Sequence, residues 1–164
     1  MNLKNVLQIF VLSYLTWLAL NWSVHTDVLV TGAIISVLIA VLLCSQCSVL
    51  QEVRLTPKSF AYAFGFVGVF WIELFKSNFD VARRVLTPSL PINPGIVEVK
   101  TRLKSNIGKM LLANAITLTP GTLTVDILGD RMFIHWIDVS STDINEATHA
   151  IVSKFEKYLE VMYG

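Results

Sequence analysis

Apolar residues dominate the first half of the chain in three long runs, and shorter periodic patterns follow in the second half. Residues 3–22 and 28–47 carry almost no charge, whereas residues 58–80 combine an apolar stretch with charges near both ends. A helix needs about 20 apolar residues to cross the roughly 30 Å hydrocarbon core of a bilayer. The pattern therefore predicts three membrane helices in a domain of residues 1–84, although the apolar part of the third, residues 60–72, is short for a full span.

The end of the third run carries charged residues at helical steps of three and four, namely Glu73, Lys76, Asp80 and Arg84. On a helix, residues with this spacing form ion pairs along one face. We interpret them as charges at the membrane interface, with Glu73 paired to Lys76. Acids inside a membrane are costly and usually functional, so the alternative is that Glu73 handles protons or cations.

Residues 85–95 contain Pro88, Pro91 and Pro94, one proline at every third position. This spacing favours an extended polyproline II strut, because proline holds φ near the value of that helix. We expect these residues to link the membrane domain to a C-terminal domain of residues 96–164.

The pattern after the linker predicts strand, helix, strand, strand and helix, at residues 96–104, 106–119, 122–128, 131–139 and from 142 or 143 onward. Gly129 and Asp130 form a two-residue hairpin turn between the last two strands. This β-α-β-β-α order makes up most of a ferredoxin-like sandwich. The predicted fold class is thus an α-helical membrane part followed by a small α+β domain, whose limited core favours docking on a partner or on the membrane.

The junction LLANAITLTPGTLTVD, at residues 111–126, joins a helical pattern to a strand pattern. Pro120 pushes the preceding residue out of the helical region, and Gly121 accepts the φ that the turn needs. The strand alternates, which predicts burial on an apolar face of Leu123, Val125 and Ile127. The break is surrounded by hydroxyls that are expected to bond backbone groups left open at the helix end: Thr117, Thr119, Thr122 and Thr124.

Four segments of the chain carry a family resemblance: ELFKSNFDVARRVL, PINPGIVEV, LLANAITLTPGTLTVDI and IHWIDV, in this order. They resemble the MnhE subunits of the multisubunit Na⁺/H⁺ antiporters of the Mrp type. The resemblance covers most of residues 73–139. It implies that seven residues of the matching motif are needed for assembly, namely Asn114, Thr117, Thr119, Pro120, Gly121, Thr122 and Asp126.

The resemblance also implies a function. The chain would be an accessory, non-catalytic subunit of a cation (Na⁺)/proton antiporter, needed for assembly or stability of the complex. Its partners would be the other subunits, including large polytopic ones related to respiratory complex I, and the lipid bilayer. It would lie in the cell membrane as a multi-pass protein with a cytoplasmic C-terminal domain.

Composition agrees with a membrane protein, since 54% of the 164 residues are hydrophobic and only 15% are charged. Basic residues gather between residues 76 and 109, beside the membrane segments, and acids dominate from Asp126 onward. Nucleic-acid binding is not expected, because no aromatic residues stand among the bases between Val81 and Lys109. The preference for basic loops on the cytoplasmic side favours two spanning helices, whereas hydrophobicity favours three.

Signatures of catalysis, metal binding or cofactor binding are missing from the sequence, so no enzyme activity, metal or cofactor is expected. Cys44 and Cys47 form a C-x-x-C pair without a second pair for a metal site, and we interpret them as two small thiols at a helix end. One alternative is a homologous subunit of an energy-converting hydrogenase or related redox complex. Another is a stand-alone membrane enzyme or ion carrier that uses Glu73 or the two cysteines.

Overall fold

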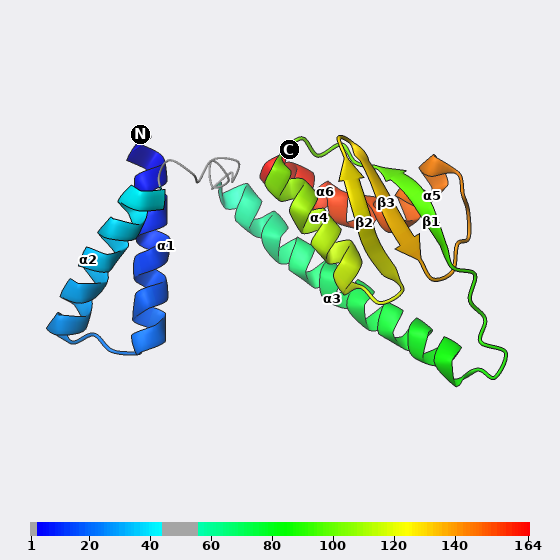
Figure 1. Ribbon diagram of the computed structural model, residues 1–164, viewed down its shortest axis with the longest axis horizontal. Helices are drawn as coiled ribbons and strands as arrows, with labels where there is room; N and C mark the ends of the chain where they lie inside the picture. Colours follow the sequence, from blue (N-terminus) through cyan, green and yellow to red (C-terminus); the bar gives the residue numbers. More distant parts are fainter. Residues whose placement is uncertain (1–2, 44–55) are drawn as a thin grey trace. The chain divides into compact units, whose positions relative to one another are not determined.

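A computed structural model describes residues 3–43 and 56–164 of the protein (Figure 1). The chain forms two compact units, Met1–Val53 and Arg54–Gly164. Cys44, Cys47 and the predicted extension of the second helix to residue 47 lie outside the described residues.

The first unit is a helical hairpin of α1 (Leu3–Asn21) and α2 (Thr26–Leu43). The Trp17 indole Nε1 donates to the Val28 carbonyl oxygen at 3.0 Å and ties the two helices together near their turn. The Trp17 ring lies directly over Gly32, where an added Cβ would overlap it. Ser36 and Ala40 continue this buried line one turn apart, so small residues permit close packing of the two helices.

The second unit begins with α3 (Pro57–Leu86), which starts one residue before the predicted helix and ends six residues after it. Thr56 caps its first turn, since the Thr56 hydroxyl accepts a hydrogen bond from the Ser59 N–H at 3.1 Å. Pro57 occupies the first turn, where its missing N–H costs nothing. In the described residues, α2 and α3 are long and apolar enough to cross a membrane, while the apolar part of α1, Val6–Asn21, is shorter.

The prediction of a regular polyproline strut after α3 is wrong. The chain turns back at Leu90, whose φ is 43°, and the Leu90 N–H donates to the Thr87 carbonyl at 2.9 Å. Asn93 then pairs with the segment after the last strand, because its N–H donates to the Ile137 carbonyl at 3.1 Å. Local hydrogen bonds of this kind compete with polyproline II, which has none of its own.

The sheet contains three strands, β1 (Gly95–Lys100), β2 (Thr122–Leu128) and β3 (Arg131–Trp136), in the order β1-β3-β2. Both pairings are antiparallel, with β3 in the centre. The first strand is shorter than predicted, and α4 (Asn106–Leu118) connects it to β2. Gly129, at φ 66°, opens the predicted two-residue turn between β2 and β3.

The single helix predicted at the C-terminus is in fact two helices, α5 (Ile144–Ile151) and α6 (Ser153–Tyr163). Asp143 caps α5, since its carboxylate accepts from the Asn145 N–H at 2.9 Å. The chain bends at Val152, which is fully buried and therefore held by the core at the bend. The observed order is thus β-α-β-β-α-α.

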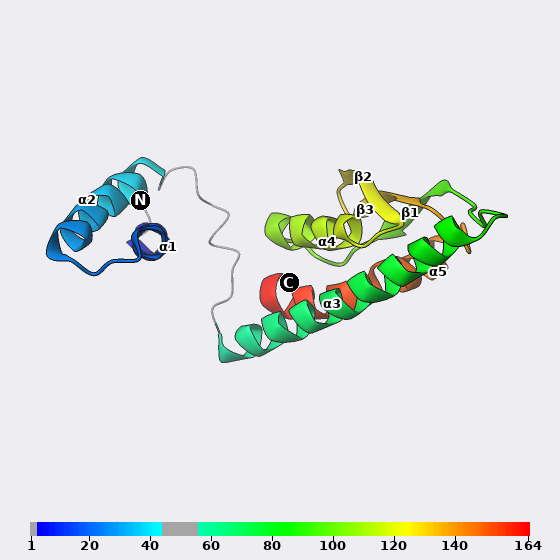
Figure 2. The same cartoon turned by 90° about the horizontal axis from the view of Figure 1, so that it is seen from below.

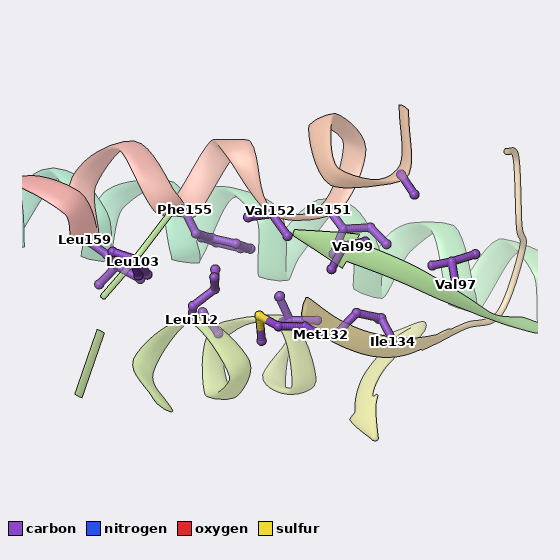
Figure 3. Packing of buried hydrophobic residues seen from close by; sticks show 13 residues of the cluster. Val97, Val99, Leu103, Leu112, Met132, Ile134, Ile151, Val152, Phe155 and Leu159 are labelled. Atoms are coloured by element: carbon purple, nitrogen blue, oxygen red, sulfur yellow. The ribbon is translucent and has the colours of Figure 1, made fainter. Parts of the chain in front are cut away.

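Helices α4, α5 and α6 cover one face of the sheet, and α3 runs along α6 on the far side (Figures 1 and 2). The core between these layers combines Val99 and Ile134 of the sheet with Leu112 of α4 and Phe155 and Leu159 of α6 (Figure 3). The Phe66 ring of α3 packs edge-on against Phe155, with centroids 6.1 Å apart. Although the sequence places a boundary at residues 85–95, contacts group α3 with the C-terminal elements.

The predicted burial in β2 is wrong at Leu123 and Val125 and confirmed at Ile127. Leu123 and Val125 are 50% and 54% exposed, whereas Thr122 and Thr124 face α4. A bulge between Thr124 and Asp126 then returns Ile127 to the core. The inversion at Leu123 and Val125 has a physical cause: the Thr122 hydroxyl donates to the Ile116 carbonyl, which is open at the end of α4, and the Thr124 hydroxyl donates to the Ala113 carbonyl one turn earlier.

Candidate functional site

The corner between α4 and β2 is held by threonine hydroxyls. Thr119 and Thr122 both donate to the Ile116 carbonyl through Oγ1, each at 2.7 Å, and Thr124 Oγ1 donates to the Ala113 carbonyl at 3.2 Å. The fourth hydroxyl, Thr117 Oγ1, accepts from the Thr124 N–H at 3.2 Å. The contacts of Thr119 and Thr122 confirm the prediction that hydroxyls bond groups left open at the helix end, whereas Thr117 and Thr124 join the helix to β2.

Gly121 brings this corner against two other elements. Its φ is +93°, and a Cβ added there would lie 3.0 Å from Cγ2 of Ile137 and 3.7 Å from Cγ2 of Val81. Thr119 before Pro120 is extended, with φ −85° and ψ 117°, as the sequence predicts. The Pro-Gly pair therefore ends the helix and also allows close approach of the corner to α3.

A cavity of about 280 Å³ lies beside the corner, between α3, α6 and the segment after β3. The corner contributes four residues: Thr119, Pro120, Gly121 and Thr122. The polar side of α3 contributes another four: Glu73, Ser77, Asp80 and Arg84. Apart from Ser77, these residues were singled out from the sequence for two different reasons, and they line one cavity.

Two ion-pair clusters connect α3 to the rest of the unit along this cavity. Lys154 Nζ of α6 lies 2.7 Å from Glu73 Oε2, while Lys76 Nζ lies 3.3 Å from Glu73 Oε1. The Glu73 side chain is 20% exposed and that of Lys76 is 70% exposed. The predicted pair with Lys76 exists, but the shorter and better shielded partner of Glu73 is Lys154.

Arg84 forms the second cluster. Its Nε lies 2.7 Å from Asp80 Oδ2, and its Nη1 lies 2.9 Å from Asp138 Oδ2 in the segment after β3. Nη1 also donates to the Pro91 carbonyl at 2.7 Å. Only 13% of the Arg84 side chain is exposed, so it joins the end of α3, the following loop and the sheet at a shielded position.

Several residues predicted to matter lie away from the cavity lining. Asn114 and Thr117 lie on α4 and Lys76 lies on α3, all outside the lining. Asp126 is exposed on β2, where its Oδ1 accepts from the N–H of Ile127 at 2.8 Å. The structure thus brings together the central part of the motif, from Thr119 to Thr122, and leaves its two ends outside.

Sequence reasoning did not single out two residues of this site, Lys154 and Asp138. Asp138 carries a signal, because it belongs to the IHWIDV segment that follows the junction motif. Lys154 carries none, since it stands 81 residues from Glu73 in an ordinary amphipathic helix.

The charges of the cavity form ion pairs with one another within the unit. Three carboxylates, of Glu73, Asp80 and Asp138, face the cations of Lys154 and Arg84 at distances of 2.7–2.9 Å. Within residues 3–43 and 56–164, no three His, Cys, Asp or Glu side chains are grouped to hold a metal ion. The arrangement is suited to fixing α3 on the α+β domain.

Comparisons with known proteins identify relatives. The model of a family described as Na⁺/H⁺ ion antiporter subunit matches residues 10–162. The MnhE-type Na⁺/H⁺ antiporter protein of Alkalihalophilus pseudofirmus is 44% identical over 79 residues, which are 47% of this chain and 50% of that protein. The corresponding Na⁺/H⁺ antiporter protein of Staphylococcus haemolyticus is 44% identical over 91 residues, 54% of this chain and 56% of that protein. The matched stretch thus spans about half the length of these curated relatives.

Two solved structures contain similar chains. A chain of the membrane-bound sulfane sulfur reductase (MBS), an archaeal respiratory membrane complex, has a TM-score of 0.84 and 43% identity, covering 96% of this chain and 98% of that one. A chain of the Mrp complex from Dietzia sp. DQ12-45-1b has a TM-score of 0.43 and 27% identity, over 60% of this chain and 92% of that one. Because the family model extends over residues 10–162, the protein belongs to the family of Na⁺/H⁺ ion antiporter subunits.

Proposed function

We propose that the protein is an accessory, non-catalytic subunit of a multisubunit Na⁺/proton antiporter, needed for assembly or stability of that complex. The observation that carries this proposal is the family match over residues 10–162. The ion pairs that line the cavity support this proposal, because they hold α3 against α6 and the segment after β3.

The surfaces of the first unit support a place among other membrane subunits. Large apolar side chains are exposed on both helices of the hairpin, for example Leu7 at 61%, Leu15 at 57%, Val37 at 51% and Leu42 at 74%. Such faces are stable in lipid or against other membrane helices. We therefore place α1 and α2 across the cell membrane, next to the large complex-I-like subunits, with the C-terminal unit in the cytoplasm.

We further propose that the C-terminal unit is a reduced ferredoxin-like sandwich that lacks the fourth strand. The strand order β1-β3-β2, the crossover through α4, and α5 and α6 after β3 support this assignment. This assignment supports a scaffolding role, since α3 adds a further layer to the domain.

A second candidate is an accessory subunit of a respiratory redox complex. It is favoured by the chain of the sulfane sulfur reductase, which is 43% identical over 96% of this chain at a TM-score of 0.84. The two hypotheses share one role for the chain, because each places it beside an antiporter-like module. A stand-alone ion carrier based on Glu73 has less support, because Lys154 neutralises that carboxylate at 2.7 Å.

The experiment is purification of the tagged chain from its native membrane in mild detergent, followed by a native gel and identification of the co-purifying subunits. Large polytopic antiporter subunits without redox subunits are the expected result. Subunits that bind metal clusters in the same band would assign the chain to a redox complex. Recovery of the chain alone would contradict the accessory role.

A further inference from the structure

Helix α3 has two different faces. One face is occupied by the protein itself along nearly the whole helix: Tyr62 packs on Tyr158, Phe66 on Phe155, and Glu73 on Lys154. At the end of the helix, Arg84 reaches Asp138. From Tyr62 to Arg84 a helix rises by roughly 33 Å, so the α+β domain lies beside α3 over that entire length.

The opposite face is an aromatic stripe, which we define as Phe60, Phe64, Val67, Trp71, Phe75 and Phe79. Its members recur at steps of three and four, and each side chain is exposed: 57%, 78%, 49%, 52%, 59% and 76% in that order. Trp71 and Phe75 stack with ring centroids 5.8 Å apart. Exposed apolar stripes of this size mark a contact surface.

The packing of α3 is incompatible with crossing a bilayer. A spanning helix would carry the domain beside it into the hydrocarbon, together with the exposed side chains of Arg102 and Glu160, which are 70% and 44% exposed. Each buried charge at the bilayer centre costs about 2.5–3.5 kcal/mol or more. Length and composition alone allow α3 to span, but its second face is already occupied.

Two features bear on what covers the aromatic stripe: the length of the connection from α2 to α3, and the charges beside the stripe. Residues 44–55 connect α2 to Thr56, and an extended chain of that length reaches at most roughly 45 Å. The chain length therefore limits the distance from the end of α2 to the start of α3 to that value. Beside the stripe, Lys76 and Arg83 are 70% and 74% exposed, and such cations favour anionic lipid headgroups.

We propose that α3 lies in the plane of the membrane surface, with the aromatic stripe buried in the lipid and the α+β domain on the aqueous side. The proposal rests on the membrane placement of α1 and α2 stated above. It assigns two spanning helices to the chain, so that the N-terminus and the C-terminal unit share one side. Interfacial helices of this kind combine Trp and Phe on one face with Lys and Arg beside it.

The test is labelling of single cysteines in native membrane vesicles of either orientation, using an impermeant maleimide and a Cys44→Ser/Cys47→Ser background. The variants Lys58→Cys and Arg83→Cys mark the two ends of α3, and Ser23→Cys marks the α1–α2 turn. We expect Lys58→Cys and Arg83→Cys to react from the same side and Ser23→Cys from the other side.

Two other labelling patterns are informative. Reaction of Lys58→Cys and Arg83→Cys from opposite sides would establish a spanning α3 and overturn the in-plane placement alone. Reaction of all three cysteines from one side would show that the hairpin does not cross the membrane, which overturns the proposed membrane placement as well.

A depth measurement tests the stripe itself. Trp71 lies near the middle of α3, so the purified full chain with Trp17, Trp22 and Trp136 replaced by phenylalanine reports its depth in vesicles of brominated lipids. An in-plane helix inserts about 5–10 Å, so bromines near the glycerol end should quench Trp71 about twofold more than bromines near the methyl end. The reverse order would indicate a span, and no quenching by either lipid would show that the stripe stays out of the lipid; either result refutes the proposal.

Discussion

Glu156 of α6 is a buried carboxylate that joins the C-terminal helix to the segment after β1. Its side chain is 4% exposed. Oε1 accepts from the Thr101 hydroxyl at 2.6 Å and from the Arg102 N–H at 2.7 Å, and Oε2 accepts from Arg102 Nε at 3.2 Å. The residue holds the chain where it leaves the sheet and turns toward α4.

Replacing Glu156 by alanine removes these acceptors and leaves the Thr101 hydroxyl and the Arg102 N–H without them. Hydrogen bonds to a charged group contribute about 1.5–3 kcal/mol each, and breaking a buried charged contact costs about 3–5 kcal/mol. We therefore expect Glu156→Ala to lower the free energy of unfolding by about 3–5 kcal/mol. Glu156→Gln keeps one carbonyl acceptor and should cost about 1–2 kcal/mol.

The measurement is urea unfolding of the full chain in mild detergent, read from the fluorescence of Trp71 and Trp136 with Trp17 and Trp22 replaced by phenylalanine. For a slope of about 2 kcal/mol per M, Glu156→Ala should lower the midpoint by roughly 1.5–2.5 M. Thr101→Val is measured alone and together with Glu156→Ala. This double-mutant cycle gives the coupling energy across the 2.6 Å hydrogen bond between Thr101 and Glu156.

Glu160→Gln is the matched control. Glu160 Oε2 lies 3.2 Å from Arg102 Nη2, but the Glu160 side chain is 44% exposed. An exposed pair contributes about 0–1 kcal/mol, so this variant should change stability little. If Glu156→Ala and Glu160→Gln were equally mild, the assigned role of the buried carboxylate would be wrong.

Three further predictions concern the corner, the ion pairs and the hairpin. Gly121→Ala should destabilise the protein by about 1–3 kcal/mol, because Gly121 has a positive φ and the added Cβ would press on Ile137. In the same urea assay Gly129→Ala should cost less, since its Cβ would meet no neighbouring atom, and equal losses would refute the packing argument. Lys154→Met should loosen the contact between α3 and α6 and increase amide hydrogen exchange at Ser77 and its neighbours, while Lys76→Met should not. Equal exchange in both variants would show that Lys154 is not the main partner of Glu73. Gly32→Leu should disrupt the hairpin of α1 and α2 and reduce the amount of the chain in purified complexes, whereas Ile34→Leu, at an exposed position, should leave that amount unchanged. Normal assembly of Gly32→Leu would contradict the tight contact between Gly32 and Trp17.

Local chemistry made much of the fold predictable from the sequence. Pro120 and Gly121 mark the end of α4, Ser105 caps its start through a bond from the Gly108 N–H at 2.9 Å, and Gly129 opens the hairpin. Each of these features depends on the backbone preferences of one or two residues. They are therefore visible in the sequence without knowledge of the surrounding structure.

Patterning failed where a neighbouring element changed which face of a segment is buried. The alternation in β2 predicts burial of Leu123 and Val125, but Thr122 and Thr124 donate to carbonyls of α4 instead, and the bulge after Thr124 lets Ile127 still reach the core. Hydrophobic periodicity records only which residues share a face. It does not record what lies opposite that face.

The candidate site shows the same limit. The sequence alone determined that Glu73, Asp80 and Arg84 share one side of a helix, since their spacing does so on any helix. Only the tertiary structure decided that Lys154 and Asp138 complete the ion pairs, because the fold brings residues far apart in the chain within 2.9 Å of them. It also decided that one face of α3 belongs to the α+β domain, since packing, unlike hydrophobicity, depends on where the other helices lie.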